Sequence, residues 1–437
     1  MTNPAKKLPL LGGARAVGGP IALGLLGAYF AVALAGLSAA AVAVLAGTGD
    51  LAARRPFAAL PLLAVHLFAL GFLPFAVTGA SFHLLPVMLR NDVRNRRRLQ
   101  AAFVLLLGGF LVPPGVAYRM PGLLWPGAAL VVAGLALVLG ELLGLVLRAP
   151  GDRTLIVSRV GVTLSSLGVA AALLLGGIAF SPGVDGRTIL VHLHLAVLGW
   201  LTILIVTVGR TLVPLLAQAP TAPARRLPLT ECSLGVGVAL VVTGLAVARN
   251  DIALAGGAVV FATLAVFARL VVRVAHARRI SIEAPLAHLL TGVAFLLQAA
   301  VLGALMLTGA LSPSRGIVGY VILLLLGWAG GVTLAHLGKL FALSVWVWWP
   351  PGPRPKQSAL YPRGLWLAEA ASFAAAVELL AAGSLVGSVP LVRSGGVLLL
   401  AAAGIAMLGA ARTWALRAHR PEPPVQSAHS KSQTGET

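Results

Sequence analysis

The chain contains twelve long apolar segments, each of about 20 residues or more. Segments of this length and composition can cross a lipid bilayer, so they restrict the chain to folds that span a membrane. In lipid every backbone polar group must be paired within the protein, so only helical bundles and closed barrels can span a membrane. Barrel strands need only about 10 residues of alternating polarity, which these segments lack. The sequence therefore predicts an all-α integral membrane protein with twelve transmembrane helices, over residues 20–46, 57–89, 99–117, 122–147, 159–181, 188–217, 229–248, 252–275, 285–310, 316–348, 364–387 and 391–416.

Composition decides between a lipid and a nucleic-acid partner. The formal net charge is +21, which in a soluble protein would favour nucleic acid. However, 10% of the residues are charged, 59% are hydrophobic and the mean hydropathy is +0.96, whereas a soluble globule has about 25% charged residues. We therefore expect a lipid bilayer and no nucleic acid. Cys232 is the only cysteine, which excludes internal disulfides and a c-type haem attachment motif.

The basic residues also predict an orientation. With the N-terminus in the cytoplasm, 26 of the 33 Lys and Arg residues fall on the cytoplasmic side and 7 on the other, as the positive-inside rule requires. We expect both termini to be cytoplasmic, residues 1–420 to form a single transmembrane bundle, and the polar residues 421–437 to be a disordered tail. The excess of Arg over Lys, with much Ala and Gly, favours the inner membrane of a bacterium.

An internal repeat includes two intramembrane histidines. His66 and His194 are each followed by Gly after five residues and by Pro after twenty. Gly327 lies in the same frame within residues 316–348, where Ile322 replaces the histidine. Because these segments are four apart in order, the sequence predicts three pseudo-repeats of four helices. Chance similarity between apolar helices remains the alternative.

The two repeated histidines suggest a cofactor. His66 and His194 each lie near the start of their span, so both are expected at a similar depth in the membrane. Imidazole side chains within a bilayer are costly and tend to be functional. A low-spin haem iron takes one neutral histidine on each face, so the pair predicts a b-type haem between helices 2 and 6. His192 projects about 200° from His194 and can serve a second site. Alternatively it meets water near the interface.

The stretches HLFALGFLPFAVTGASFHLLP, at residues 66–86, and His192-Leu-His194 through Val213-Pro214 resemble subunit I of the haem–copper oxidases, the catalytic subunit of cytochrome c oxidase. The resemblance implies twelve spans in a three-by-four arrangement. It also implies His66 and His194 as the ligands of the low-spin haem b, and His192 as the proximal ligand of a second haem.

The chain departs from that pattern at the copper site. It has no His-His pair, and its His-x-His motif lies on the sixth span rather than the tenth. Copper and oxygen reduction are therefore left open. The same features equally resemble smaller twelve-span membrane proteins that contain haem and copper and are linked to nitric oxide stress.

The resemblance implies a haem-binding redox protein of electron transport, either respiratory or related to nitric oxide. Its electron donor would be a protein or a quinol, and other respiratory subunits would be its partners. Whether it is an oxidoreductase without a standard copper site stays open. The alternative is a haem-free transporter or a metal-handling permease, which Pro113-Pro114 and the intramembrane Glu141 and Glu378 motivate.

Further polar residues lie within the predicted spans. His83, His288 and His336 reach a similar depth near the cytoplasmic side and could form a metal or haem site, or could be interfacial histidines. Glu141 and Glu378 could belong to a proton route, pair with haem propionates, or form salt bridges with arginines from neighbouring spans. Glu369 lies near the expected interface, so we expect it to need no special partner.

Overall fold

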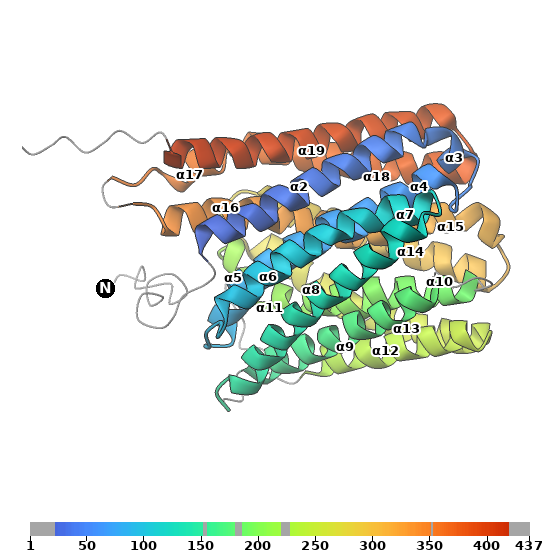
Figure 1. The fold of residues 1–437 in the computed structure, drawn as a ribbon, viewed down its shortest axis with the longest axis horizontal. Coiled ribbons are helices and arrows are strands. Elements are labelled where there is room, and N and C mark those ends of the chain that lie inside the picture. Colours follow the sequence, from blue (N-terminus) through green and yellow to red (C-terminus); the bar gives the residue numbers. More distant parts are fainter. Residues whose placement is uncertain (1–21, 152–154, 180–185, 220–227, 351–352, 419–437) are drawn as a thin grey trace, which may run out of the picture.

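A computed structural model describes residues 22–151, 155–179, 186–219, 228–350 and 353–418, and in these ranges the chain is a bundle of helices without strands (Figure 1). Twelve helices are long and apolar enough to cross a membrane, as predicted. The predicted tail and both chain ends lie outside the described residues. The helices are α2 (Leu23–Ala46), α4–η1–α5 (Ala59–His66, Leu67–Phe72, Leu73–Met88), α6–η2–α7 (Arg96–Leu107, Gly108–Leu111, Val112–Ala117), α8 (Pro121–Arg148), α9 (Ile156–Ala179), α10–η4–α11 (Gly186–His194, Leu195–Thr202, Ile203–Leu216), α12 (Leu229–Ala246), α13 (Asn250–Ala277), α14 (Ala284–Leu307), α15–η5–α16 (Pro313–Val321, Ile322–Gly330, Gly331–Val347), α18 (Arg363–Val386) and α19 (Val389–Ala418).

Two short helices mark the two ends of the bundle. Helix α3 (Thr48–Ala52) lies at the right-hand end in Figure 1 and α17 (Gln357–Leu360) at the left-hand end.

Local sequence explains where the long helices start and stop. Pro121 and Pro313 occupy first-turn positions, where a missing N–H costs nothing. Gly387 follows α18 with a φ of +75°, a left-handed conformation that suits glycine and ends the helix.

Three of the long helices change to π-helical geometry within the span. The π segments are η1, η4 and η5, in the second, sixth and tenth spans. Two of them begin directly after His66 and His194, and the third begins at Ile322, the position that the repeat frame assigns to the missing histidine. Such segments widen the helix by one residue per turn and are frequent at functional sites.

Glycines bring each of two π segments against the preceding long helix. A Cβ added to Gly36 of α2 would overlap the backbone of Gly71 in η1, and a Cβ added to Gly168 of α9 would overlap that of Gly199 in η4. Small residues permit such backbone contact, which is a common way to pack helices in lipid.

The π segments meet in the middle of the bundle. The indole nitrogen of Trp328 in η5 donates a 2.9 Å hydrogen bond to Oγ1 of Thr202 in η4, and both side chains are fully buried. Phe68 of η1 fills the space beside Gly330, where a Cβ would collide with its ring. The tenth span is 78% buried over its most apolar window, more than any other described span, so it is the central helix.

Candidate functional site

A large cavity lies near the α3 end and has a volume of about 1000 Å³. Its walls come from the second, sixth and tenth spans, completed by α8 and α9, and most of the lining side chains are apolar. His66 and His192 both line it, together with Arg54 and Arg187. Its volume is at the upper end of the range for small-molecule and cofactor sites, about 300–1,000 Å³.

The two cavity histidines are held in one tautomer. Nδ1 of His66 donates to the carbonyl of Leu62 at 2.8 Å, and Nδ1 of His192 donates to the carbonyl of Ala172 on α9 at 2.8 Å. A neutral imidazole whose Nδ1 carries the proton has its lone pair on Nε2, the atom that ligates haem iron or a metal ion. A backbone carbonyl in this position is the usual second-shell partner of a ligating histidine.

Two arginines line the same cavity. Arg54 donates from Nε to the carbonyl of Ser384 at 3.0 Å and from Nη2 to that of Leu385 at 2.8 Å, so its guanidinium also fixes the end of α18. Arg187 is exposed and lies five residues, or about 7 Å along the helix, before His192. The cavity therefore combines apolar walls with a cationic end, which suits an apolar ligand that bears carboxylates.

His194 lines a different cavity, of about 440 Å³, which α13 and α14 complete. Its Nδ1 donates to the carbonyl of Leu190 at 2.7 Å, so Nε2 accepts the 2.8 Å hydrogen bond from the hydroxyl of Tyr320. The rest of the lining is apolar and includes Phe261 and Val301, which are 45% and 58% exposed on the outer face of the bundle. This second cavity is therefore a groove that opens sideways between α13 and α14.

The structure thus separates residues that the sequence interpretation paired. His66 shares a cavity with His192, while His194 contacts Tyr320 and the second cavity. The expectation that His192 and His194 face opposite sides of their helix agrees with this arrangement. Tyr320 was missed. It lies seven residues before Gly327, just as His192 lies seven before Gly199, so extending the repeat frame to the tenth span would have singled it out.

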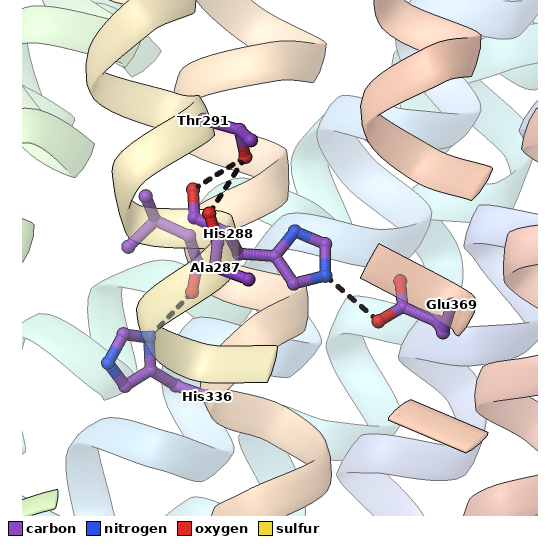
Figure 2. Close-up of polar contacts among 6 residues, drawn as sticks. Ala287, His288, Thr291, His336 and Glu369 are labelled. Carbon is purple, nitrogen blue, oxygen red and sulfur yellow. Dashed lines mark hydrogen bonds and ion pairs between the residues drawn. The ribbon is translucent and has the colours of Figure 1, made fainter. Parts of the chain in front are cut away.

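Near the α17 end, His288 and Glu369 form a buried pair. Nε2 of His288 and Oε2 of Glu369 are 2.8 Å apart, and neither side chain is exposed. Figure 2 shows the ring of His288 pointing to Glu369 on α18, with His336 on the other side of His288. The expectation that Glu369 needs no special partner was wrong, because the side chain points into the bundle instead of toward the interface.

The three histidines predicted as an inner site make separate contacts. Nε2 of His83 lies 3.1 Å from Oγ of Ser344, while His288 pairs with Glu369 and Nδ1 of His336 donates to the carbonyl of Val332 at 2.7 Å. Within the described ranges no three His, Cys, Asp or Glu side chains group closely enough to hold a metal ion.

The intramembrane carboxylates have identifiable partners. Glu141, 3% exposed, forms a 3.3 Å ion pair with Arg98, which corresponds to the salt-bridge alternative. Glu378 accepts a 2.7 Å hydrogen bond from the amide of Gln298 on the outer face of the bundle. Sequence reasoning missed a further pair, in which Arg210 contacts both carboxylate oxygens of the fully buried Glu231 at 2.9 Å.

A polar cluster surrounds the loop before α18. Lys339 forms a 2.8 Å ion pair with Glu283, and its ammonium lies 4.7 Å from the ring centroid of Tyr361. Burial raises the pKa of Tyr361 above its usual range, and the nearby carboxylates of Glu283 and Glu369 raise it further. The phenol therefore stays protonated at any physiological pH.

No family model matches the chain, and no curated protein matches it.

Proposed function

We propose that the chain is a multi-pass membrane redox protein that binds a b-type haem in the large cavity near the α3 end. The observation that supports this most is the presence of His66 and His192, from two different spans, on the walls of one cavity of about 1000 Å³. Bundle interiors commonly build haem sites from histidines on facing helices. When bound, the haem would supply an iron that takes up and releases one electron.

The described residues fit this cofactor. The mostly apolar walls suit a porphyrin, and the two Nδ1–H···O=C hydrogen bonds fix the tautomer in which Nε2 can act as a ligand. Arg54 and Arg187, which also line the cavity, would supply guanidinium groups for the propionates. His66 and His192 would therefore hold the haem iron, in place of the His66 and His194 pair that the family resemblance implies.

The second cavity supports a quinol as the electron donor. It opens sideways to the lipid phase, is lined by apolar side chains and ends at the His194–Tyr320 pair. Since the Tyr320 hydroxyl donates to His194, its oxygen can accept a hydrogen bond from a quinol hydroxyl. Oxidation of a quinol to the quinone releases two protons and two electrons, and a one-electron haem would accept these electrons one at a time, passing the first to an electron acceptor before it takes the second. His192 and His194 are two residues apart, so the sixth span would separate donor from haem.

Architecture and location complete the proposal. We propose that the twelve helices form three repeats of four, because each π segment lies in the second helix of a unit. The α17 end would be cytoplasmic in the inner membrane of a bacterium, with both termini on that side, which the distribution of Lys and Arg supports. Copper and further respiratory subunits have no support among the described residues.

The test is an absorption spectrum of the purified protein and of three variants. We expect a low-spin b-haem spectrum that His66→Ala and His192→Ala abolish and that His194→Ala retains. Loss in His194→Ala, with retention in His192→Ala, would restore the pairing that the resemblance implies. A colourless wild-type protein would refute the haem and favour a haem-free transporter that uses the cavity for its substrate.

A further inference from the structure

Two polar side chains lie on the outer face of the bundle in the middle of their spans. Gln298 of α14 and Glu378 of α18 are both exposed, and the Gln298 amide donates to Oε1 of Glu378 at 2.7 Å. Each lies about 20 Å from the helix end nearest α17 and about 12–14 Å from the other end. In a membrane this position is far from both aqueous surfaces.

A carboxyl group on such a face is costly. Ionisable residues within transmembrane segments almost always point into the bundle or toward another protein group. Here the surrounding side chains point outward and are apolar, among them Leu297 at 43% exposure and Val301 at 58%. Within the described part of the chain, the only polar contact of Gln298 and Glu378 is with each other.

The pair has unused hydrogen-bonding capacity that is complementary to itself. The Gln298 amide has a second N–H, and Oε2 of Glu378 is a second acceptor or, when protonated, a donor to an amide oxygen. A copy of the same pair turned by 180° offers the missing partner for each group. Carboxyl and carboxamide groups match in both protonation states of the acid.

The surface around Glu378 also permits close approach. Ala371, Ala375 and Ala382 are exposed on the same face of α18, spaced by one helical turn to either side of the carboxyl group. Small residues at this spacing let two helices approach with their backbones close together. The stripe and the polar pair lie on one continuous outer face.

We propose that α14 and α18 form the interface of a two-fold symmetric homodimer in the membrane. In the dimer, Gln298 and Glu378 of one copy close a ring of four side chains with the same residues of the second copy. An isologous interface of this kind uses one patch twice, which is the commonest symmetry of homo-oligomers. Gln298 and Glu378 line neither cavity, although Leu297 and Val301 beside them on α14 also line the second one.

Cysteine cross-linking in native membranes tests the interface. Cys232 is the only cysteine, so Cys232→Ser provides the background. Ala375→Cys and Ala382→Cys are then oxidised separately, and Gly404→Cys is the matched control, because Gly404 is exposed on α19 with no atom within 4 Å of an added Cβ. We expect a disulfide-linked species of twice 44.6 kDa for at least one α18 variant and none for the control.

A second measurement isolates the polar pair. Gln298→Leu with Glu378→Leu, placed in the cross-linking variant, should lower the linked fraction at least tenfold, while leucine remains compatible with lipid. No cross-linking above the Gly404→Cys level would overturn the proposal, and so would linkage to a different protein. An unchanged linked fraction in the double leucine variant would remove the role of the polar ring.

Discussion

At the scale of single residues, hydrogen bonds determine what each buried imidazole can do. His66 and His192 donate from Nδ1 to backbone carbonyls, which leaves Nε2 as the basic nitrogen of each ring. His194 has the same Nδ1 arrangement, yet its Nε2 accepts from Tyr320. His288 instead uses Nε2 against the carboxylate of Glu369. The residue type is the same in all four cases, so the partner of each ring nitrogen has to be read from the structure.

The buried pair of His288 and Glu369 should contribute strongly to stability. His288→Ala would leave the carboxyl group of Glu369 buried without a partner, so we expect the free energy of unfolding to fall by about 3–5 kcal/mol. Denaturant titration in detergent measures the loss. Arg249→Ala is the control, because the Arg249–Asp251 ion pair is more than 60% exposed on both sides. Equal unfolding midpoints for the two variants would contradict a stabilising role.

Filling the large cavity should prevent haem binding without disturbing the fold. Gly177 lines this cavity, and a Cβ added to it meets no atom within 4 Å. Gly177→Phe therefore adds a bulky ring to open space, and we expect the haem content per protein to fall at least tenfold. Gly404→Phe is the matched control on the outer face of α19. If Gly177→Phe retained full haem content and an unchanged spectrum, the haem would have to lie elsewhere.

At the scale of elements, the π segments η1, η4 and η5 are the main departure from regular helices. Each adds a residue to a turn, which rotates the side chains on one side of it relative to those on the other. Trp328 and Thr202 are thereby positioned to bond across the centre of the bundle. The glycine contacts of η1 and η4 with α2 and α9 exist only because neither partner has a side chain.

The backbone contact between Gly168 and Gly199 should be sensitive to side-chain size. Gly168→Leu would force α9 away from η4, since even a Cβ overlaps the backbone there. Overpacking of this kind costs about 1–3 kcal/mol or more. We therefore expect a lower temperature of thermal aggregation in detergent than for Gly404→Leu, which faces open space. A Gly168→Leu protein as stable as that control would show that the two helices can separate freely.

At the scale of the whole molecule, eleven of the twelve described membrane-spanning helices surround the tenth, which carries no histidine in its first half. The two cavities lie on either side of the sixth span, near the α3 end, and the buried polar contacts of His83, His288 and Glu369 lie toward the α17 end. The two large cavities therefore lie in the half of the molecule nearest α3, and these buried polar contacts lie in the half nearest α17.

The proposed orientation predicts which end of the molecule a reagent added outside the cell can label. Ser314 is exposed at the α3 end and Ser358 is exposed in α17. In a Cys232→Ser background, a membrane-impermeant maleimide added to intact cells should label Ser314→Cys and leave Ser358→Cys unlabelled until the cells are opened. The reverse pattern would invert the topology that the Lys and Arg distribution predicts.

The number and approximate limits of the helices could be predicted from the sequence, because hydrophobicity over about 20 residues is a local property. The depth of His66, His192 and His194 within their spans follows equally from position along the chain. The direction in which a side chain points depends on the rotation of its helix against its neighbours. For that reason the outward carboxyl group of Glu378 and the inward one of Glu369, nine residues apart on one helix, could not be told apart beforehand.

The sequence by itself therefore determined a chain of twelve apolar helices with histidines at matched depth in the second and sixth. Only the tertiary structure decided that His66 shares a cavity with His192 and that His194 contacts Tyr320 instead. The physical reason is that a cavity is defined by side chains from several helices at once. Its composition depends on helix rotation, on the π turns and on glycine contacts between distant segments, none of which is encoded by local hydrophobicity.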